Sequence, residues 1–149
     1  MIQKTLSLPY PVSANVYWRT RVAGKIAMTY VSNEAKAYKA QVLALARAAG
    51  IITPIKGRVQ LEIWLYPGRP QDWQKRQQKL GANWDDGVRC IDLDNANKVL
   101  LDSLKDVVIE DDAWVRRIAS QRMEPDEGGA RVVVRVTSIE SEAPQATLV

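Results

Sequence analysis

Two acidic pairs bracket a stretch of helical periodicity in the second half of the chain. Asp92 and Asp94 lie before that stretch, and Asp111 and Asp112 lie just after it. Hard divalent cations such as Mg²⁺ prefer oxygen ligands, usually one or two carboxylates together with water and a substrate phosphate. The acidic pairs therefore predict a cation site, provided that the fold brings the two segments together. The alternative is a capped surface helix with acidic turns, since Asp is common at both places.

The stretch between the acidic pairs predicts an amphipathic helix that begins near Asn95. Asp94 or Asn95 is expected to cap it, because a short carboxylate or amide accepts hydrogen bonds from the amides of the first turn. Lys98 lies one turn beyond Asp94 on the polar side, with Asp102 one turn further. An ammonium group beside a cation site can neutralise charge on a phosphate or a leaving oxygen. Apolar or small residues recur at intervals of three and four on the other side; they are Ala96, Val99, Leu100, Ser103, Leu104 and Val107.

Composition limits the chemistry that is open to the chain. It has 149 residues, a net charge of +4 and no histidine. The lack of histidine excludes Ser-His-Asp triads, histidine general bases and histidine-ligated zinc. The modest basic excess permits nucleic-acid binding without requiring it. Cys90 is the only cysteine, so no internal disulfide can form, which suits a reducing cytoplasm, and its place beside Asp92 indicates core packing. No apolar run approaches the length of a membrane span.

The rest of the chain predicts one α+β domain over residues 1–139, followed by a flexible polar tail over 140–149. We expect a mixed sheet of about five to seven strands packed with two principal helices. Ser32 is expected to cap the first of these, which runs to about Ala49 and packs through one stripe; the stripe is Ala35, Tyr38, Val42, Leu45, Ala46 and Ala49. A short polar helix is expected over 72–80. The strands are expected over 2–8, 15–21, 25–31, 57–66, 114–123 and 131–139, with a hairpin turn at 23–24.

Basic side chains gather near the predicted hairpin. Arg19, Arg21 and Lys25 lie close to the turn, with Tyr17 and Trp18 beside them. Basic residues interleaved with aromatic residues are typical of a ribbon that contacts phosphates. Half-buried packing of the aromatic rings is the alternative.

The acidic run resembles the core signature of the RusA-type Holliday-junction endonucleases, which are small, dimeric, magnesium-dependent enzymes typical of phages and prophages. The likeness rests on Asp92-Leu93-Asp94-Asn95, on Lys98, and on Asp111-Asp112 after an amphipathic helix. It extends to Leu8-Pro9-Tyr10-Pro11, to the residues Ser13 and Asn15, and to the Val31-Ser32 and Ala37-Tyr38 segments.

The resemblance implies a role for each of the matching residues. Asp92, Asp94 and Asp112 would bind Mg²⁺, with Mn²⁺ as an alternative metal, and Asp111 would be an adjacent contributor. Lys98 would be the catalytic lysine. The protein would then be a cytoplasmic homodimer that resolves four-way and other branched DNA in recombination and repair. The alternatives are a non-catalytic phage protein that binds branched DNA, and a metal-dependent nuclease for flaps or plain duplex.

The polar segment 69–87 departs from the short basic connection expected in that family. It carries Arg69, Lys75, Arg76 and Lys79, and Arg89 lies two residues after its end. This basic insertion can grip the DNA backbone, or it can be a solvated loop; Asp85-Asp86 within it predicts a turn.

Overall fold

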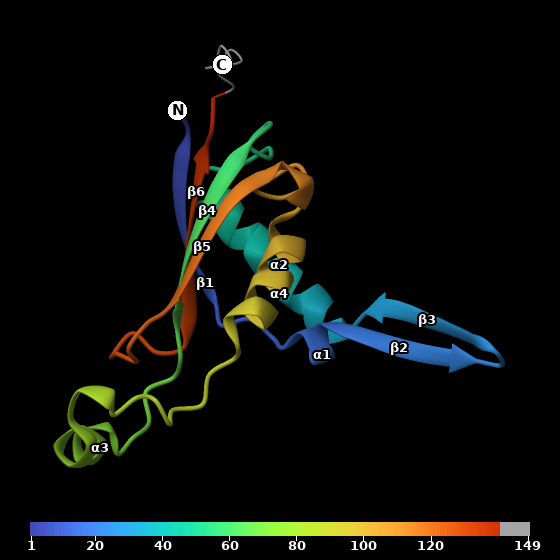
Figure 1. Cartoon of the computed structure of the whole chain (residues 1–149). Helices are drawn as coiled ribbons and strands as arrows, with labels where there is room; N and C mark the ends of the chain where they lie inside the picture. Colours follow the sequence, from blue (N-terminus) through green and yellow to red (C-terminus); the bar gives the residue numbers. More distant parts are fainter. Residues whose placement is uncertain (141–149) are drawn as a thin grey trace, which may run out of the picture.

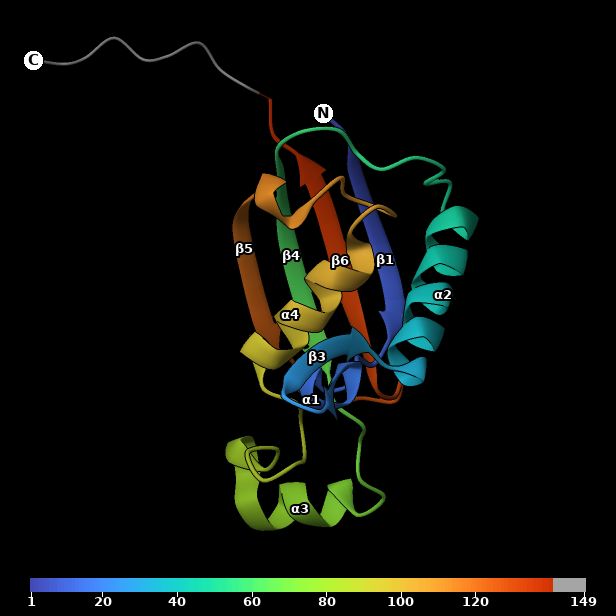
Figure 2. The same ribbon diagram turned by 90° about the vertical axis from the view of Figure 1, so that its right-hand side faces the viewer.

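Two long helices cover one face of a four-stranded β-sheet in the computed structural model, which describes residues 1–140 (Figure 1). The sheet contains, in spatial order, β1 (Gln3–Pro9), β6 (Arg131–Ser138), β4 (Val59–Tyr66) and β5 (Val115–Arg122). β4 and β5 pair in parallel, and the other neighbours pair antiparallel. The helices are α2 (Asn33–Ala48) and α4 (Leu93–Leu104), and Figure 2 shows both in front of the sheet. The predicted α+β class with a mixed sheet and two principal helices is confirmed.

The core lies between this sheet and the two helices. β4 alternates as predicted, and its buried residues are Val59, Leu61, Ile63 and Leu65. α4 buries the predicted face through Ala96, Val99, Leu100, Ser103 and Leu104. α2 begins after Ser32, whose hydroxyl oxygen accepts a hydrogen bond from the Ala35 N–H at 3.1 Å. Its buried stripe is narrower than predicted, because Leu45 and Ala49 are exposed at its C-terminal end.

The hairpin forms a separate ribbon and does not join the sheet. β2 (Trp18–Ala23) and β3 (Ile26–Val31) pair only with each other, so the six described strands divide into two sheets instead of the single sheet expected. The turn is Gly24-Lys25, one residue later than predicted, and Gly24 has the positive φ of 62° that a two-residue hairpin favours. Figure 1 shows the ribbon projecting from the body.

The strand predicted to start at residue 15 is wrong at its N-terminal end. Residues Ala14–Tyr17 form a single helical turn, α1, whose N-terminus is capped by the Ser13 hydroxyl. Tyr17 is fully buried there, so it belongs to the core and not to the exposed ribbon. Local strand propensity of Val16 and Tyr17 is overridden because burial and the Ser13 cap favour the turn.

The insertion folds as a small lobe beyond the end of the sheet (Figure 2). It contains α3 (Trp73–Leu80) and the short helix η1 (Gly81–Asn83). Trp84 is buried, and its indole N–H donates to the Glu124 carboxylate at 2.6 Å. The Arg122 guanidinium donates to the carbonyl oxygens of Asp85 and Val88 at 3.0 and 2.8 Å. These contacts fix the lobe to the end of β5.

Two predictions concern the ends of the chain and membranes. Of the predicted tail over 140–149, residues 141–149 lie outside the described part. Among residues 1–140, every helix is too short or too polar to cross a lipid bilayer.

Candidate active site

Asp92 occupies the N-cap position of α4, with an extended backbone at φ −64° and ψ 145°. Its carboxylate makes no capping hydrogen bond, and neither Asp94 nor Asn95 caps the helix, so the predicted cap is wrong. Asp92 and Asp94 are both exposed to solvent. Their oxygens therefore remain free for a cation, at a helix terminus whose free amides also attract phosphate.

The segment before Asp92 is held by side chains from the N-terminal motif. The Tyr10 hydroxyl accepts a hydrogen bond from the Ile91 N–H at 2.7 Å. The Asn95 side-chain oxygen accepts one from the Ala14 N–H, which joins α1 to the first turn of α4. The sequence predicted only a capping role for Asn95 and none for Tyr10, although the likeness of residues 8–15 to the family indicated that this segment matters. These bonds position Asp92 and Asp94 from outside α4.

Asp92 lines a pocket of about 500 Å³ at this end of the molecule. Arg89, Cys90, Ser13 and Asn95 also line this pocket. Arg89 is exposed, whereas Cys90 is half-buried against the core, as predicted. A pocket that joins a carboxylate to a guanidinium can hold a phosphate bridged by a cation.

Lys98 is exposed one turn beyond Asp94 and makes no ion pair within residues 1–140. Its ammonium is therefore free to meet a bound anion. Asp102 has a different role, because it accepts hydrogen bonds from the Tyr17 hydroxyl and from Lys39, the latter at 2.8 Å. Burial opposes the charge on Asp102, but these hydrogen bonds prevail and hold its pKa below the ordinary value. Asp102 fastens α4 to α1 and α2 and is not part of the site.

The second acidic pair lies past the C-terminal end of α4. Asp112 begins the short helix η2 (Asp112–Trp114), which replaces the start of the strand predicted from residue 114. The Asp111 carboxylate accepts from the Ala113 N–H at 3.0 Å and lies 3.6 Å from the Lys105 ammonium. A hydrogen bond with the Asp111 carboxyl and its negative charge raise the pKa of Asp112. A cation bound between two such neighbouring carboxylates would relieve their repulsion.

Within a single chain, the two acidic pairs lie at opposite ends of α4 and far from each other. α4 has 12 residues, and at a rise of 1.5 Å per residue it spans about 18 Å. Asp92 and Asp94 lie at its start, whereas Asp111 lies beside Lys105 just after its end. Accordingly, the described part of the chain contains no group of three or more acidic or cysteine residues that could hold a metal ion. The metal-binding role of each carboxylate stays a prediction.

Apart from Arg89, the basic residues expected to bind DNA lie on two projections. Arg19, Arg21 and Lys25 are exposed on the hairpin, and the register places both arginines on one face. Lys75 and Lys79 are exposed on α3. Figure 1 shows the hairpin and the α3 lobe extending from the end of the molecule where α4 begins.

Two further basic residues of the lobe already have partners in the structure. Arg76 pairs with Asp72 at 2.9 Å, and the Arg69 guanidinium stacks 4.3 Å from the centre of the Trp73 ring. To bind a phosphate, Arg76 must share or break its ion pair with Asp72, and Arg69 must share or break its stacking on Trp73.

Comparison with known proteins identifies a family for the chain. The family model described as "Endodeoxyribonuclease RusA" matches residues 9–137. The match includes Pro9-Tyr10-Pro11 of the N-terminal motif, the whole of α4 and both acidic pairs. A search of the curated proteins finds no match. Because the family model covers most of the 149 residues, the chain belongs to the RusA endodeoxyribonuclease family.

Proposed function

We propose that this protein is a Mg²⁺-dependent endonuclease that cuts four-way DNA junctions as a homodimer, acting in cytoplasmic recombination and repair of phage or prophage DNA. The observation that supports this best is the placement of exposed carboxylates, Asp92, Asp94 and Asp112, at the two ends of α4 in a member of an endodeoxyribonuclease family. Asp92 and Asp94 form one half of the metal site, and Asp112 forms the other half, with Asp111 beside it.

The donor set suits Mg²⁺, or Mn²⁺ in its place. Asp92 and Asp94 are exposed and uncommitted, and Mg²⁺ usually takes one or two carboxylates and keeps several waters. When bound, such a metal lowers the pKa of a coordinated water and stabilises charge on the phosphoryl group. The carboxylates orient this site on the rigid first turn of α4, which Asn95 and Tyr10 hold in place.

A two-fold dimer resolves the separation of the acidic pairs. If two copies pack with their α4 helices antiparallel, the start of one helix lies beside the end of the other. Asp112 of the partner subunit then completes the set that Asp92 and Asp94 begin, and the symmetry creates two equivalent sites. Two equivalent sites are what the resolution of a junction requires, because two matched strands must be cut.

Lys98 and Arg89 would act on the phosphate. Arg89 lines the pocket with Asp92, and its guanidinium can hold non-bridging phosphate oxygens. Lys98 extends from the same exposed side of α4 as Asp94 and can meet the negative charge that develops in the transition state. Neither cation is neutralised by an ion pair among residues 1–140, so both remain available to DNA.

The two projections would hold the arms of the junction. Arg19, Arg21 and Lys25 supply the hairpin with positive charge, and Lys75 and Lys79 supply the outer side of α3. Both projections leave the body near the proposed site (Figure 1). Contacts of this kind bind the backbone without reading its sequence.

Replacing Lys75, Arg76 and Lys79 together with Ala is expected to weaken junction binding and to flatten its salt dependence. A plot of log K against log salt concentration has a negative slope. Each lost phosphate contact makes this slope about 0.9 less steep, because fewer counterions are released. Binding titrations at several salt concentrations measure the slope. Replacing the exposed Gln74 and Gln78 of the same helix with Ala is the control and should leave the slope unchanged. An unchanged slope in the triple variant would show that the lobe does not contact the backbone.

Cleavage of three DNA substrates tests the proposed function. A four-way junction, a flap and a plain duplex of the same sequence are incubated with the protein and Mg²⁺. We expect paired symmetrical nicks in the junction and little cutting of the others. Preferential cutting of the flap or duplex would show a different nuclease specificity, and tight binding of the junction without cutting would show a non-catalytic binding protein.

A further inference from the structure

A second cleft lies between the lobe and the turn that joins β5 to β6. Its volume is about 500 Å³, within the range of about 300–1,000 Å³ that is usual for small-ligand sites. Tyr66, at the end of β4, contributes from the sheet. Trp73 and Gln77 contribute from α3, and Glu127 contributes from the turn. None of these residues has a role in the proposed cleavage.

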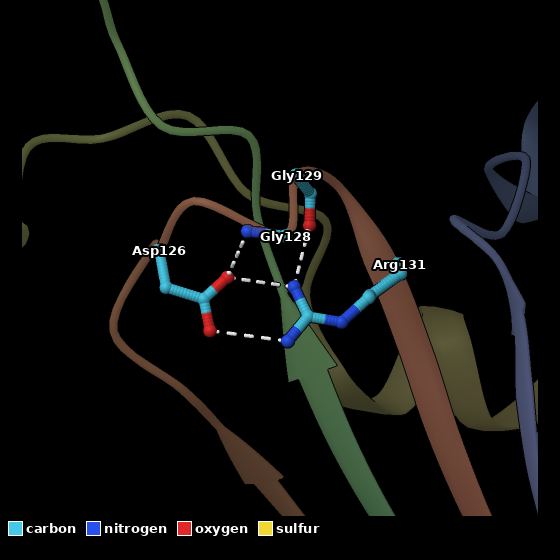
Figure 3. A network of polar contacts seen from close by, with 4 residues as sticks. All are labelled: Asp126, Gly128, Gly129 and Arg131. Carbon is cyan, nitrogen blue, oxygen red and sulfur yellow. Dashed lines mark hydrogen bonds and ion pairs between the residues drawn. The ribbon is translucent and has the colours of Figure 1, made fainter.

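The turn side of the cleft is held rigidly, as Figure 3 shows. The Asp126 carboxylate accepts two hydrogen bonds from the Arg131 guanidinium, at 2.7 and 3.0 Å, and one from the Gly128 N–H at 2.9 Å. A Cβ atom at Gly128 would collide with the Arg131 guanidinium, so a side chain there would displace the guanidinium from Asp126. That guanidinium also stacks 3.9 Å from the centre of the Tyr66 ring. This contact holds the Tyr66 ring in place on one side of the cleft.

The lobe side of the cleft presents a second aromatic ring. Trp73 is half-buried, and Arg69 stacks on it at 4.3 Å. Because residues four apart share one side of a helix, Gln77 lies next to Trp73, whereas Lys75 and Lys79 lie on the opposite side of α3. The helix therefore turns an uncharged aromatic and amide side toward the cleft and a basic side away from it.

The charges of the cleft favour a nucleobase over a phosphate. Three carboxylates, from Glu124, Asp126 and Glu127, line it against one cation, Arg69, and this excess of negative charge disfavours a phosphate. Gln77 and Glu127 make no side-chain hydrogen bond within residues 1–140. An amide and a free carboxylate can bond the amino and imino groups on the edge of a base. Aromatic rings supply stacking that every base can use.

The cleft adjoins the proposed active site. Gly68 and Ala130 line the pocket that contains Asp92, and a Cβ atom at Gly68 would lie 3.8 Å from the Ala130 Cβ. Arg69 follows Gly68 directly and lines the cleft. A strand whose phosphate lies at Asp92 thus has a neighbouring nucleotide within reach of Trp73.

We propose that the cleft between Tyr66 and Trp73 binds one unstacked nucleobase that flanks the scissile phosphate. The inference rests on the proposed junction cleavage and adds a specificity site to it. Bases at the crossover of a junction are the ones that can leave the stack most readily, because their stacking is already interrupted. The insertion would then select where on the junction the cut falls.

Double-mutant cycles between the protein and the DNA test this site. Junctions with a single abasic nucleotide at successive positions around the cut are bound to the parent and to Trp73→Ala in EDTA, which prevents cleavage. At one position, removal of the base should weaken binding to the parent by about tenfold, since stacking of a base on an aromatic ring contributes about 1–3 kcal/mol. Trp73→Ala should cost about the same, and the two changes together should cost no more than either one.

Two further variants separate stacking from folding. Trp73→Phe keeps an aromatic ring, so removal of the base should still weaken its binding to the junction. Gln78→Ala changes an exposed residue of α3, and removal of the base should weaken its binding as much as it weakens that of the parent. Strictly additive effects at every position, with the parent still cutting the junction, would overturn the base-binding site and leave the proposed function intact. Failure of the parent to bind any branched DNA would overturn both.

Discussion

Asp94→Asn is expected to reduce junction cleavage in Mg²⁺ by about a thousandfold or more, with junction binding intact or stronger. The amide keeps the shape of the side chain but removes the negative charge that a hard cation needs, and a catalytic metal supplies several kcal/mol of transition-state stabilisation. Removing negative charge beside a phosphate does not weaken electrostatic attachment. Single-turnover cleavage of a saturated complex measures the effect without a contribution from binding.

Asp106→Asn is the matched control for this prediction. Asp106 is an exposed carboxylate just past α4, and its φ of 64° is one that Asn also tolerates. Its replacement should leave both folding and cleavage unchanged. Asp92→Asn and Asp112→Asn should behave like Asp94→Asn. Near-normal cleavage by Asp94→Asn or Asp112→Asn would show that the carboxylate is not part of the metal site.

Lys98→Ala is expected to slow cleavage about a hundredfold while folding and dimerisation persist. The ammonium is exposed beside Asp94 and unpaired within residues 1–140, so it can stabilise charge on the phosphate in the transition state, an interaction that contributes on the order of 3 kcal/mol. An exposed helical Lys→Ala change scarcely alters helix propensity. Lys98→Arg should recover only part of the rate, because a forked guanidinium does not replace a compact ammonium.

The measurement for Lys98 is again single-turnover cleavage of a saturated junction complex. Lys36→Ala, an exposed lysine on α2, should cleave at the parent rate. If Lys98→Ala cleaves within a few-fold of the parent, Lys98 is an ordinary surface residue.

The sequence predicted best the elements whose pattern extends over many residues. The alternation of β4 and the apolar face of α4 follow directly from spacing, because burial on one side imposes the period. Prediction from the sequence failed where only a few residues decide between two local structures. Val16 and Tyr17 have strand propensity, yet the Ser13 cap and the burial of Tyr17 make a helical turn. Similarly, Leu45 fits the stripe of α2, but it lies at the edge of that stripe and is exposed beside the fully buried Ala46.

The candidate site shows a comparable limit. The residue types and spacing around α4 indicated Asp92, Asp94 and Lys98 as candidate site residues, and the structure leaves all three exposed, without the cap expected from Asp94 or Asn95. Spacing alone could not tell whether both acidic pairs meet within one chain, since that depends on the direction of the chain after α4. The roles of Tyr10 and Asn95 were also hidden, because each acts through a backbone amide far away in the sequence.

Subunit complementation tests most directly the claim that the active site is shared between two copies. Asp94→Asn and Asp112→Asn proteins, each inactive alone, are mixed and allowed to exchange subunits, and the mixed dimers are isolated through different tags. In a mixed dimer, one site would combine the intact Asp92 and Asp94 of one subunit with the intact Asp112 of the partner subunit. We therefore predict that mixed dimers nick one strand of each junction but do not complete the second cut. Mixed dimers as inactive as their parents would contradict this account, because a site built within one chain is damaged in both subunits.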